Sequence, residues 1–315
     1  MNKCISIVIP VYNEGKNVEE IVRSVQDVTS SLPYECTITF IDDGSDDSTL
    51  EIIKEQCLLN MNISFISLSR NFGHQNAIKA ALDYCTADCV ITMDGDMQHP
   101  PELIPQLIEK WEAGNDIVYT VRKDSKKLSG FKRKTSSIFY KLLNYLSGIE
   151  IEEGTADFRL LDKKIVNVLC SLEEDNLFWR GLVKWIGFRQ ASIEYSPALR
   201  KFGKSKYTFK KMVSFGLNGI TSFSTKPLTI AIYLGFICAL LSLLYIPYVL
   251  WSIYTGRAIS GWASLIVTIV FFGGLQLMIL GILGIYLGKL FMQSKKRPHY
   301  IIKESAVARR VLKHR

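Results

Sequence analysis

The chain has 315 residues, of which 48% are hydrophobic, and this composition excludes a wholly disordered or collagen-like protein. Its formal net charge of +8 is unevenly distributed. Residues 1–121 hold 7 Lys and Arg against 19 Asp and Glu, whereas residues 122–141 and residues 292–315 each hold 8 against 1. This pattern does not predict a uniform nucleic-acid-binding surface. It indicates a metal or polar-ligand site in the first part and contact with anionic lipid or phosphate further on.

The seven cysteines include no CxxC pair and their number is odd, so we expect reduced thiols rather than a disulfide framework or a zinc ribbon. The segment Met1–Glu14 has a short apolar run without a small-residue cleavage site, so no signal peptide is expected.

In the first 121 residues, short apolar runs rich in β-branched residues alternate with amphipathic segments. The runs predict buried, parallel strands over Cys4–Val11, Cys36–Ile41, Ile63–Leu68, Cys89–Met93 and Asp116–Val121. The segments between them predict helices over Asn17–Asp27, Ser48–Gln56, Asn76–Tyr84 and Pro101–Glu112. This alternation is typical of an α/β sheet with crossover helices, in which ligands bind beyond the carboxyl ends of the strands.

Polar residues follow three of these predicted strands. They are Pro10–Glu14, Asp42–Thr49 and Asp94–Gln98. Carboxylates grouped at one edge of a sheet repel each other unless a cation is bound between them. Asp94 and Asp96, separated by one glycine, can turn their oxygens to one point as ligands for Mg²⁺ or Mn²⁺, and Gln98 can add an amide oxygen. A lone DxD is often only a turn, but three such loops together favour a metal site that binds a substrate diphosphate.

Signatures of several other enzyme classes are missing. Neither GxxxxGK[ST] nor GxGxxG follows the first predicted strand, which argues against kinase-like and dinucleotide-cofactor functions. HExxH and GxSxG are also absent from the sequence.

Two long uncharged stretches occur near the C-terminus. No charged residue lies between Lys226 and Arg257 or between Arg257 and Lys289, and each gap exceeds the roughly 20 apolar residues that span a bilayer. We therefore predict transmembrane helices over about 228–251 and 263–287. The alternative of two buried core helices is disfavoured because soluble helices rarely stay uncharged for so long. Glycines in the second span permit helix association and hence a homo-oligomer.

Lys and Arg are concentrated on one side of this hairpin. The turn holds only Arg257, whereas the outer ends hold Lys210, Lys211, Lys226, Lys289, Lys295, Lys296 and Arg297. The positive-inside rule then places both termini in the cytoplasm. The predicted organisation is a cytoplasmic domain over 1–225, a transmembrane hairpin over 226–291 and a basic tail over 292–315 that is disordered beyond Ser294.

Two upstream segments, Phe131–Leu146 and Thr208–Phe223, interleave bulky apolar residues with lysines. We expect interfacial helices near 131–146 and 208–223, and the alternative is a pair of ordinary amphipathic helices on the soluble core.

The runs PVYNE (Pro10–Glu14), DDGSDDST (Asp42–Thr49) and DGDMQHP (Asp94–Pro100) closely resemble motifs of family-2 glycosyltransferases of the GT-A, Rossmann-like fold. GTADFRLLD, RGLVKWIGF and RKFGKSKYTFKK, followed by two spans, resemble the polyprenyl-phosphate branch, which includes dolichyl-phosphate mannose synthases and bacterial undecaprenyl-phosphate glucosyltransferases. The resemblance covers essentially the whole chain. It implies an α/β GT-A cytoplasmic domain followed by two C-terminal transmembrane helices in a bacterial inner (plasma) membrane.

The resemblance also implies roles for particular residues. The nucleotide would be bound by Pro10, Tyr12, Glu14, Asp42, Asp43 and Asp94. The metal, Mg²⁺ or Mn²⁺, would be bound by Asp94, Asp96 and Gln98. Phosphates of the donor or acceptor would be bound by Arg122, Lys134, Arg200, Lys204, Ser205, Lys206 and Tyr207. Asp96 and Asp157 would serve catalysis.

Asp157 is implied to be the base of an inverting displacement. A phosphate monoester acceptor has a second pKa of about 6, however, so it is largely dianionic near neutrality and hardly needs to be deprotonated. Asp157 can instead orient the acceptor or position Arg159, and a helix cap or an ion pair with Arg159 is the purely structural alternative.

The predicted function is the inverting, metal-dependent transfer of one glucose from UDP-glucose to polyprenyl (undecaprenyl) phosphate at the cytoplasmic membrane face. The lack of a QxxRW sequence favours single transfer over polymerisation. GDP-mannose, UDP-N-acetylhexosamine and modified arabinose donors stay open, as do protein, diacylglycerol and glycan acceptors. A non-catalytic membrane scaffold is the alternative from another class. The expected partners are the nucleotide-sugar, the polyprenyl phosphate and the lipid bilayer, with no nucleic acid.

Overall fold

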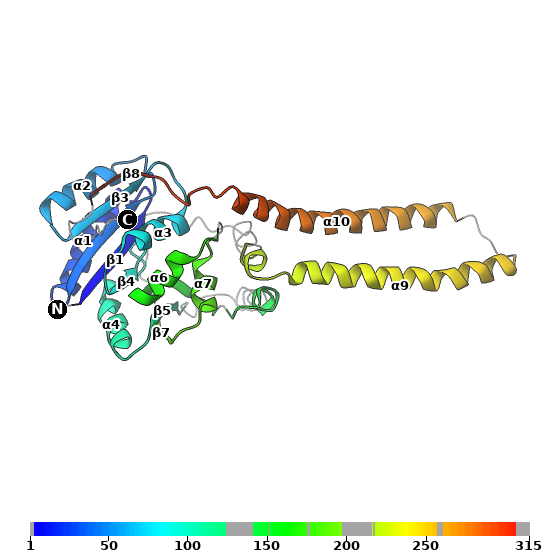
Figure 1. Ribbon diagram of the computed structural model, residues 1–315, viewed down its shortest axis with the longest axis horizontal. Coiled ribbons are helices and arrows are strands. Elements are labelled where there is room, and N and C mark those ends of the chain that lie inside the picture. The colour runs from blue at the N-terminus through cyan, green and yellow to red at the C-terminus, as the bar shows by residue number, and fades with distance from the viewer. Residues whose placement is uncertain are drawn as a thin grey trace.

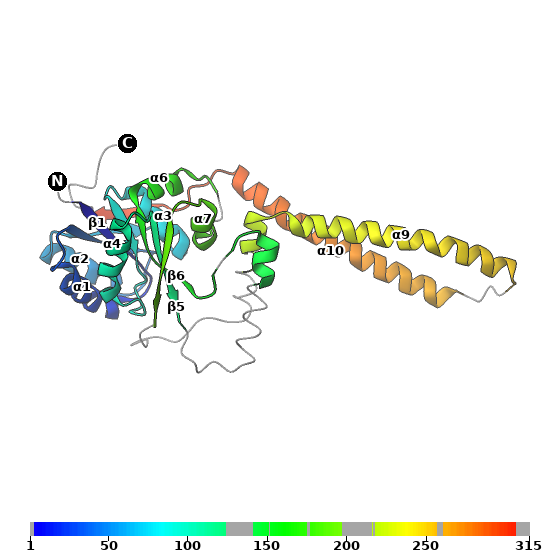
Figure 2. The same ribbon diagram turned by 90° about the horizontal axis from the view of Figure 1, so that it is seen from below.

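The computed structural model describes residues 3–123, 141–150, 152–174, 177–196, 216, 218–256 and 261–306. Within these ranges, the chain forms an α/β body from which two long helices project side by side (Figures 1 and 2). Parts of both expected interfacial helices, residues 131–140, 208–215 and 217, lie outside the described residues.

The body is built on a mixed sheet with the strand order β7-β5-β6-β4-β1-β2-β3-β8. The strands are β1 (Cys4–Val11), β2 (Glu35–Asp42), β3 (Ile63–Leu68), β4 (Cys89–Thr92), β5 (Ile117–Arg122), β6 (Thr155–Asp162), β7 (Gln190–Tyr195) and β8 (Ile302–Ala306). The first five match the predicted strands to within one residue at each end. The central strands β4, β1, β2 and β3 are parallel, as expected, whereas β6 is antiparallel to both β4 and β5. The predicted α/β class is therefore confirmed.

Helices cover both faces of the sheet because successive side chains on each strand point to opposite faces. On β1, Ile7 belongs to one buried apolar cluster and Val8 to the other. The first cluster lies beneath α1 (Gly15–Thr29), α2 (Thr49–Leu59), the short 3-10 turn η1 (Pro101–Leu103) and α4 (Ile104–Glu112). The second lies beneath α3 (His74–Tyr84), α6 (Lys163–Ser171) and α7 (Trp179–Trp185). The four predicted helices are therefore present, and all seven cysteines are free, as expected.

The prediction of a disordered tail beyond Ser294 is wrong for Ile302–Ala306. These residues form β8, which pairs antiparallel with β3 and closes that edge of the sheet. The segment is held by three further contacts: the Ser69 amide donates to the Ile301 carbonyl (2.8 Å), the Tyr300 hydroxyl donates to Asp83 (2.9 Å), and Lys54 forms an ion pair with Glu304 (2.8 Å). An otherwise open strand edge offers unpaired backbone groups, and the chain that leaves the long helices satisfies them.

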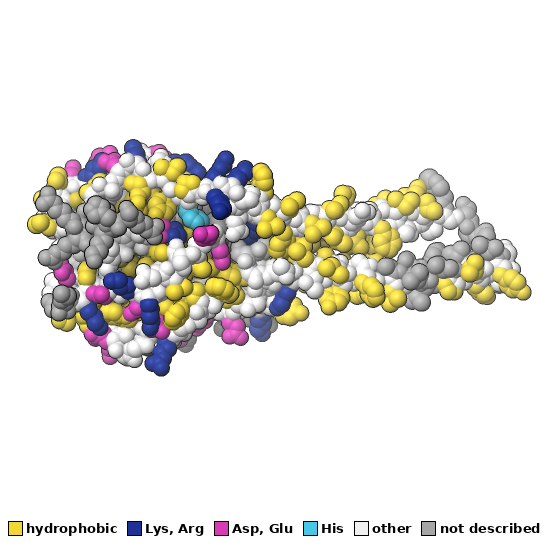
Figure 3. Space-filling model, in the orientation of Figure 1, with side chains coloured by type: hydrophobic (Ala, Val, Ile, Leu, Met, Phe, Trp, Pro, Cys, Tyr) yellow, Lys and Arg dark blue, Asp and Glu magenta, His cyan; other side chains and the backbone are white. Residues whose placement is uncertain are grey.

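The two long helices are α9 (Lys226–Tyr254) and α10 (Trp262–Ser294). Among the described residues, one helical segment, Ser264–Ser294, is long and apolar enough to cross a membrane, with a mean hydropathy of 2.4. None of its apolar window is buried, which excludes the buried-core alternative for this helix. Apolar side chains gather along both helices, while charged side chains are concentrated on the body (Figure 3). The second predicted span, within α9, stays a prediction.

Candidate active site

A pocket of about 430 Å³ lies beyond the carboxyl ends of β1 and β4. Its lining comes from segments that are far apart in the sequence. The lining residues are Pro10, Tyr12, Glu14, His74, Gln75, Asp94, Gly95, Asp96, Asp157, Phe178 and Arg180. Six of them, Pro10, Tyr12, Glu14, Asp94, Asp96 and Asp157, belong to the site residues expected from the sequence.

The turn that carries the two acidic residues passes directly over the end of β1. A Cβ atom on Gly95 would lie 2.7 Å from Cγ1 of Val11, so a side chain at this position would collide with the strand. Glycine is the residue that permits such a close backbone approach. The glycine between Asp94 and Asp96 therefore has a packing reason, and it lets both carboxylates line the pocket.

Two histidines surround Asp94. His74, at the start of α3, brings Nε2 to 3.4 Å from Asp94 Oδ1. His99 is buried, stacks on Phe158 at 5.2 Å, and accepts a hydrogen bond from the Asp94 amide at Nδ1 (3.0 Å). An imidazole that accepts at Nδ1 carries its proton on Nε2, and this atom lies 3.6 Å from Asp94 Oδ2. His99 thus fixes the loop that presents Asp94.

Gln98 is turned away from the position expected of a metal ligand. Its backbone N–H and its Nε2 donate to Asp96 Oδ1 (3.1 Å) and Oδ2 (2.8 Å), while its Oε1 accepts from Arg122 Nη1 (3.4 Å). No group of three His, Cys, Asp or Glu among the described residues can by itself hold a metal ion. The carboxylates present fit a metal site that substrate phosphates complete, because Mg²⁺ is usually bound by one or two carboxylates together with such phosphates. Asp94 and Asp96 supply such a pair.

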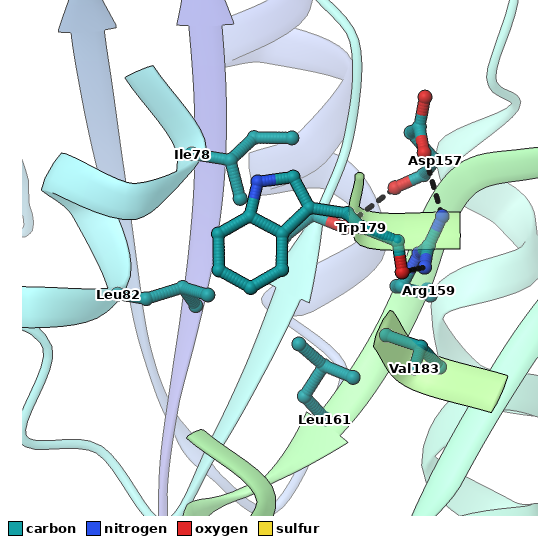
Figure 4. Close-up of a pocket in the computed structure, with 8 residues that line it drawn as sticks. Ile78, Leu82, Asp157, Arg159, Leu161, Trp179 and Val183 are labelled. Carbon is teal, nitrogen blue, oxygen red and sulfur yellow. Dashed lines mark hydrogen bonds and ion pairs between the residues drawn. The ribbon is translucent and has the colours of Figure 1, made fainter. Parts of the chain in front are cut away.

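Asp157, on β6, is the centre of a buried ion-pair network. It accepts from Arg159 (2.6 Å) and from Arg180 (3.0 Å), and His74 lies 3.9 Å away. Arg159 also reaches the Trp179 carbonyl (3.5 Å), beside a small apolar cavity lined by Ile78, Leu82, Leu161 and Val183 (Figure 4).

Burial disfavours the charged form of Asp157, but the positive charges of Arg180 and Arg159, assisted by His74, outweigh this effect and hold the pKa of the carboxyl well below its usual range. The ion pair between Asp157 and Arg159, which the sequence analysis gave as a structural alternative for Asp157, is present in the structure.

Asp42 and Asp43 are buried and do not line the pocket. Asp42 accepts from the Ser45 amide (3.0 Å) and the Ser67 hydroxyl (2.9 Å), whereas Asp43 accepts from the amides of Phe72 (2.7 Å) and Gly73 (2.9 Å). Burial raises the pKa of Asp43, although the two amides oppose the shift. In this structure, both carboxylates brace the loops that lead into α2 and α3.

The remaining expected site residues are basic or flank the basic segments. Arg122 is exposed at the end of β5, and its contact with Gln98 brings it near the carboxylate pair. The others, Lys134, Arg200, Lys204, Ser205, Lys206 and Tyr207, lie outside the described residues.

Besides Gly95, which belongs to the turn between Asp94 and Asp96, four lining residues have no role in the expected site: His74, Gln75, Phe178 and Arg180. Gln75 and Trp179 are 104 residues apart in sequence, yet the Gln75 side-chain oxygen accepts from the Trp179 amide (3.2 Å) and the Gln75 carbonyl accepts from the indole N–H (2.8 Å). In the sequence analysis, the RGLVKWIGF run is the only signal for this region. It gives no reason to choose Arg180 as a site residue.

Carboxylates on one wall and an arginine on another, at the carboxyl edge of parallel strands, define a pocket suited to a phosphate-bearing substrate. Residues 6–169 match the family described as Glycosyl transferase family 2. The chain belongs to this family, and it is a glycosyltransferase.

Relatives match over nearly the full length. The bactoprenol glucosyl transferase of Shigella phage SfV is 42% identical over 300 residues, which cover 95% of this chain and 98% of that protein. The glycosyltransferase YkcC of Bacillus subtilis strain 168 is 42% identical over 301 residues, which cover 95% of this chain and 93% of that protein.

Among solved structures, glucosyl-3-phosphoglycerate synthase of Mycobacterium tuberculosis, in complex with Mn²⁺ and UDP-glucose, aligns with a TM-score of 0.47 and 15% identity. The alignment covers 70% of this chain and 77% of that chain, and a likeness at this level carries no argument about function.

Proposed function

We propose that the protein transfers one glucose from UDP-glucose to the phosphate of a polyprenyl lipid, with inversion at the anomeric carbon. The observation that carries the proposal is the pocket itself, in which the carboxylates of Asp94 and Asp96 share one space with Arg180. The name of the Shigella phage relative, a bactoprenol glucosyl transferase, supports glucose as the sugar and a polyprenyl carrier as the acceptor.

The donor side of the pocket is formed by the loops after β1 and β4. Tyr12 and Glu14 are suited to the nucleoside, and the Glu14 loop is held by the bond from its amide to the Thr49 hydroxyl (3.0 Å). Asp94 and Asp96 would hold a divalent cation, Mg²⁺ or Mn²⁺, against the diphosphate. Such a cation neutralises the negative charge that develops on a departing nucleoside diphosphate. The proposed role of Gln98 as a further ligand requires its amide to turn away from Asp96.

Asp157 acts as an orienting charge rather than as a base. Its lowered pKa keeps it ionised throughout the neutral range, and a carboxylate of that kind is a weak proton acceptor. The acceptor phosphate is itself largely dianionic near neutrality and can attack without losing a proton. Asp157 therefore serves by holding Arg180 at the pocket wall and by keeping Arg159 charged within the body.

The path of the chain supports two membrane crossings. Residues before α9 and residues after α10 lie in the same sheet, since β3 pairs with β8. If α10 crosses the bilayer, the chain must cross once more to return to the body, and α9 is the helix placed to do so. With Lys and Arg at the body end of the hairpin, we infer that the body and both termini lie in the cytoplasm, at a bacterial inner membrane.

The test uses the full-length protein in detergent or nanodiscs. UDP-glucose, GDP-mannose and UDP-N-acetylglucosamine are each supplied with short-chain polyprenyl phosphate, and the products are identified by mass spectrometry. We expect one hexose on the lipid phosphate with UDP-glucose. A product formed only with another donor would correct the sugar. Transfer to diacylglycerol, protein or glycan in place of the polyprenyl phosphate would correct the acceptor, and absence of transfer from every donor would favour a scaffold.

A further inference from the structure

The wall of the pocket that faces the membrane helices is made by α7 and the residue before it. Phe178 and Arg180 both line the pocket, and α7 lies on the side of the body from which α9 and α10 project (Figures 1 and 2). Tyr12, Glu14, Asp94 and Asp96 line the same pocket from the loops after β1 and β4. The pocket therefore combines an acidic wall with a wall that is cationic and aromatic.

We propose that Phe178 and Arg180 form the subsite for the lipid acceptor, with Arg180 binding its phosphate and Phe178 contacting its first isoprene carbons. This inference rests on the proposed function, because it takes a polyprenyl phosphate as the acceptor. Both residues lie in the part of the chain that the structure describes.

Arg180 is placed to bind an anion. Arg159 and Arg180 both pair with the carboxylate of Asp157. Arg159 is fully enclosed, whereas the Arg180 side chain is 25% exposed. Among the described residues that line the pocket, Arg180 is the only Lys or Arg. A phosphate that enters the pocket therefore finds its cationic donor in Arg180, and a guanidinium can bind two phosphate oxygens at once.

Phe178 connects the pocket to apolar packing at the base of the membrane helices. It is buried with Leu143 and Ile149, and Ile220 and Phe223 pack against these three residues; we name this group the membrane-base cluster. The rings of Phe178 and Phe223 meet edge to face at 6.0 Å. Phe178 is the member of this cluster that also lines the pocket, so its ring can contact the first apolar carbons of a lipid away from water.

The residues that carry Phe223 are held by α10 as well as by the body. Residues 218–223 are helical and lead directly into α9. Tyr286 of α10 donates to the Ser224 carbonyl (2.7 Å), and Lys289 donates to the Ser222 hydroxyl (3.1 Å). The base of the helix pair is thus connected through Phe223 to Phe178, which lines the pocket together with Arg180.

The test compares Arg180→Gln with Lys184→Gln in the full-length protein. Lys184 lies one turn further along α7, donates to the Tyr119 hydroxyl (2.9 Å) and does not line the pocket, so its variant is a matched control. Arg180→Gln is expected to raise the KM for short-chain polyprenyl phosphate by about 10- to 100-fold and to leave the KM for UDP-glucose within about twofold, because a charge-assisted hydrogen bond is lost on the acceptor side only. Lys184→Gln is expected to change neither constant. Arg180→Lys is expected to recover part of the acceptor affinity, since it keeps the charge and loses the two-point contact.

An increase in the UDP-glucose KM with an unchanged acceptor KM overturns the inference and assigns Arg180 to the donor diphosphate. An unchanged acceptor KM in Arg180→Gln also overturns it. Binding of a fluorescent short-chain polyprenyl phosphate separates this inference from the proposed function. If the wild-type protein binds this lipid but transfers no glucose, the proposed reaction fails, and weaker binding by Arg180→Gln still supports the subsite. If Arg180→Gln does not fold, Arg180→Lys carries the same acceptor-binding test, and unaltered binding by that variant together with Phe178→Leu overturns the subsite.

Discussion

Replacing Gly181 by alanine tests how closely α7 packs against the residues that lead into α9. A Cβ atom at this position would lie 2.5 Å from Cε2 of Phe223 and 2.6 Å from Cδ1 of Phe178. Carbon atoms normally pack at about 3.5–4.0 Å, so both rings must move by roughly 1 Å. Overpacking of this kind costs about 1–3 kcal/mol. Because Phe178 lines the pocket, the same displacement is expected to raise the acceptor KM.

Gly219 offers a matched control in the same group of aromatic rings. A Cβ atom there would lie 3.5 Å from Cζ of Phe178 and 3.6 Å from Cδ1 of Leu143, which are ordinary contacts. Both glycines are helical, so alanine gains a similar helix propensity at each site and the comparison isolates the collision. Denaturant unfolding in detergent should find Gly181→Ala less stable than Gly219→Ala by about 1–3 kcal/mol. Equal unfolding midpoints, with the acceptor KM unchanged in both variants, would refute the packing argument.

Three further changes test separate parts of the structure. Asp96→Ala is expected to abolish transfer while the circular dichroism spectrum is preserved, and wild-type activity of this variant in Mg²⁺ would contradict the carboxylate site. Tyr300→Phe removes the hydrogen bond to Asp83 and is expected to lower the free energy of unfolding by about 1 kcal/mol; an unchanged midpoint would argue against the docking of the chain after α10. Because the pKa of Asp157 is lowered in the folded protein, its stabilising effect is complete above the unfolded value of about 4 and is lost as pH falls through the lowered value. The difference in unfolding temperature between wild type and Asp157→Asn should therefore be constant from about pH 8 to pH 5 and narrow only below about pH 4, and a difference that already narrows near pH 6 would contradict the ion-pair network.

The strands and helices predicted for the first 121 residues are present in the structure because the sequence pattern that predicts each of them is local. Residues Ile5–Val11 of β1 are all buried, so the sequence of this strand is an almost continuous apolar run. Strand β6 carries no such signal, since Asp157 and Arg159 interrupt its apolar residues and are buried only by pairing with each other and with Arg180. Strand β8 is five residues long and reads IKESA, and only the open edge of β3 makes it a strand.

The residues of the candidate site also differ in whether the local sequence predicts them. Asp94 and Asp96 follow a strand and are separated by one residue, so their position in the same pocket follows from the local sequence. Arg180 reaches the pocket through an ion pair with Asp157, and no spacing rule connects residues on different elements in this manner. Asp42 and Asp43 were expected in the site but lie outside the pocket. Their motif does not distinguish a carboxylate that binds a ligand from one that accepts hydrogen bonds from backbone amides of a nearby loop.

Metal-dependent glucose transfer to the lipid is measured most directly with the purified full-length protein in nanodiscs, isotopically labelled UDP-glucose, short-chain polyprenyl phosphate and Mg²⁺ or Mn²⁺. We expect a polyprenyl phosphate that gains a single labelled hexose, and we expect chelation of the divalent cation to stop this gain. A lipid that stays unmodified with every nucleotide-sugar and either cation would contradict it.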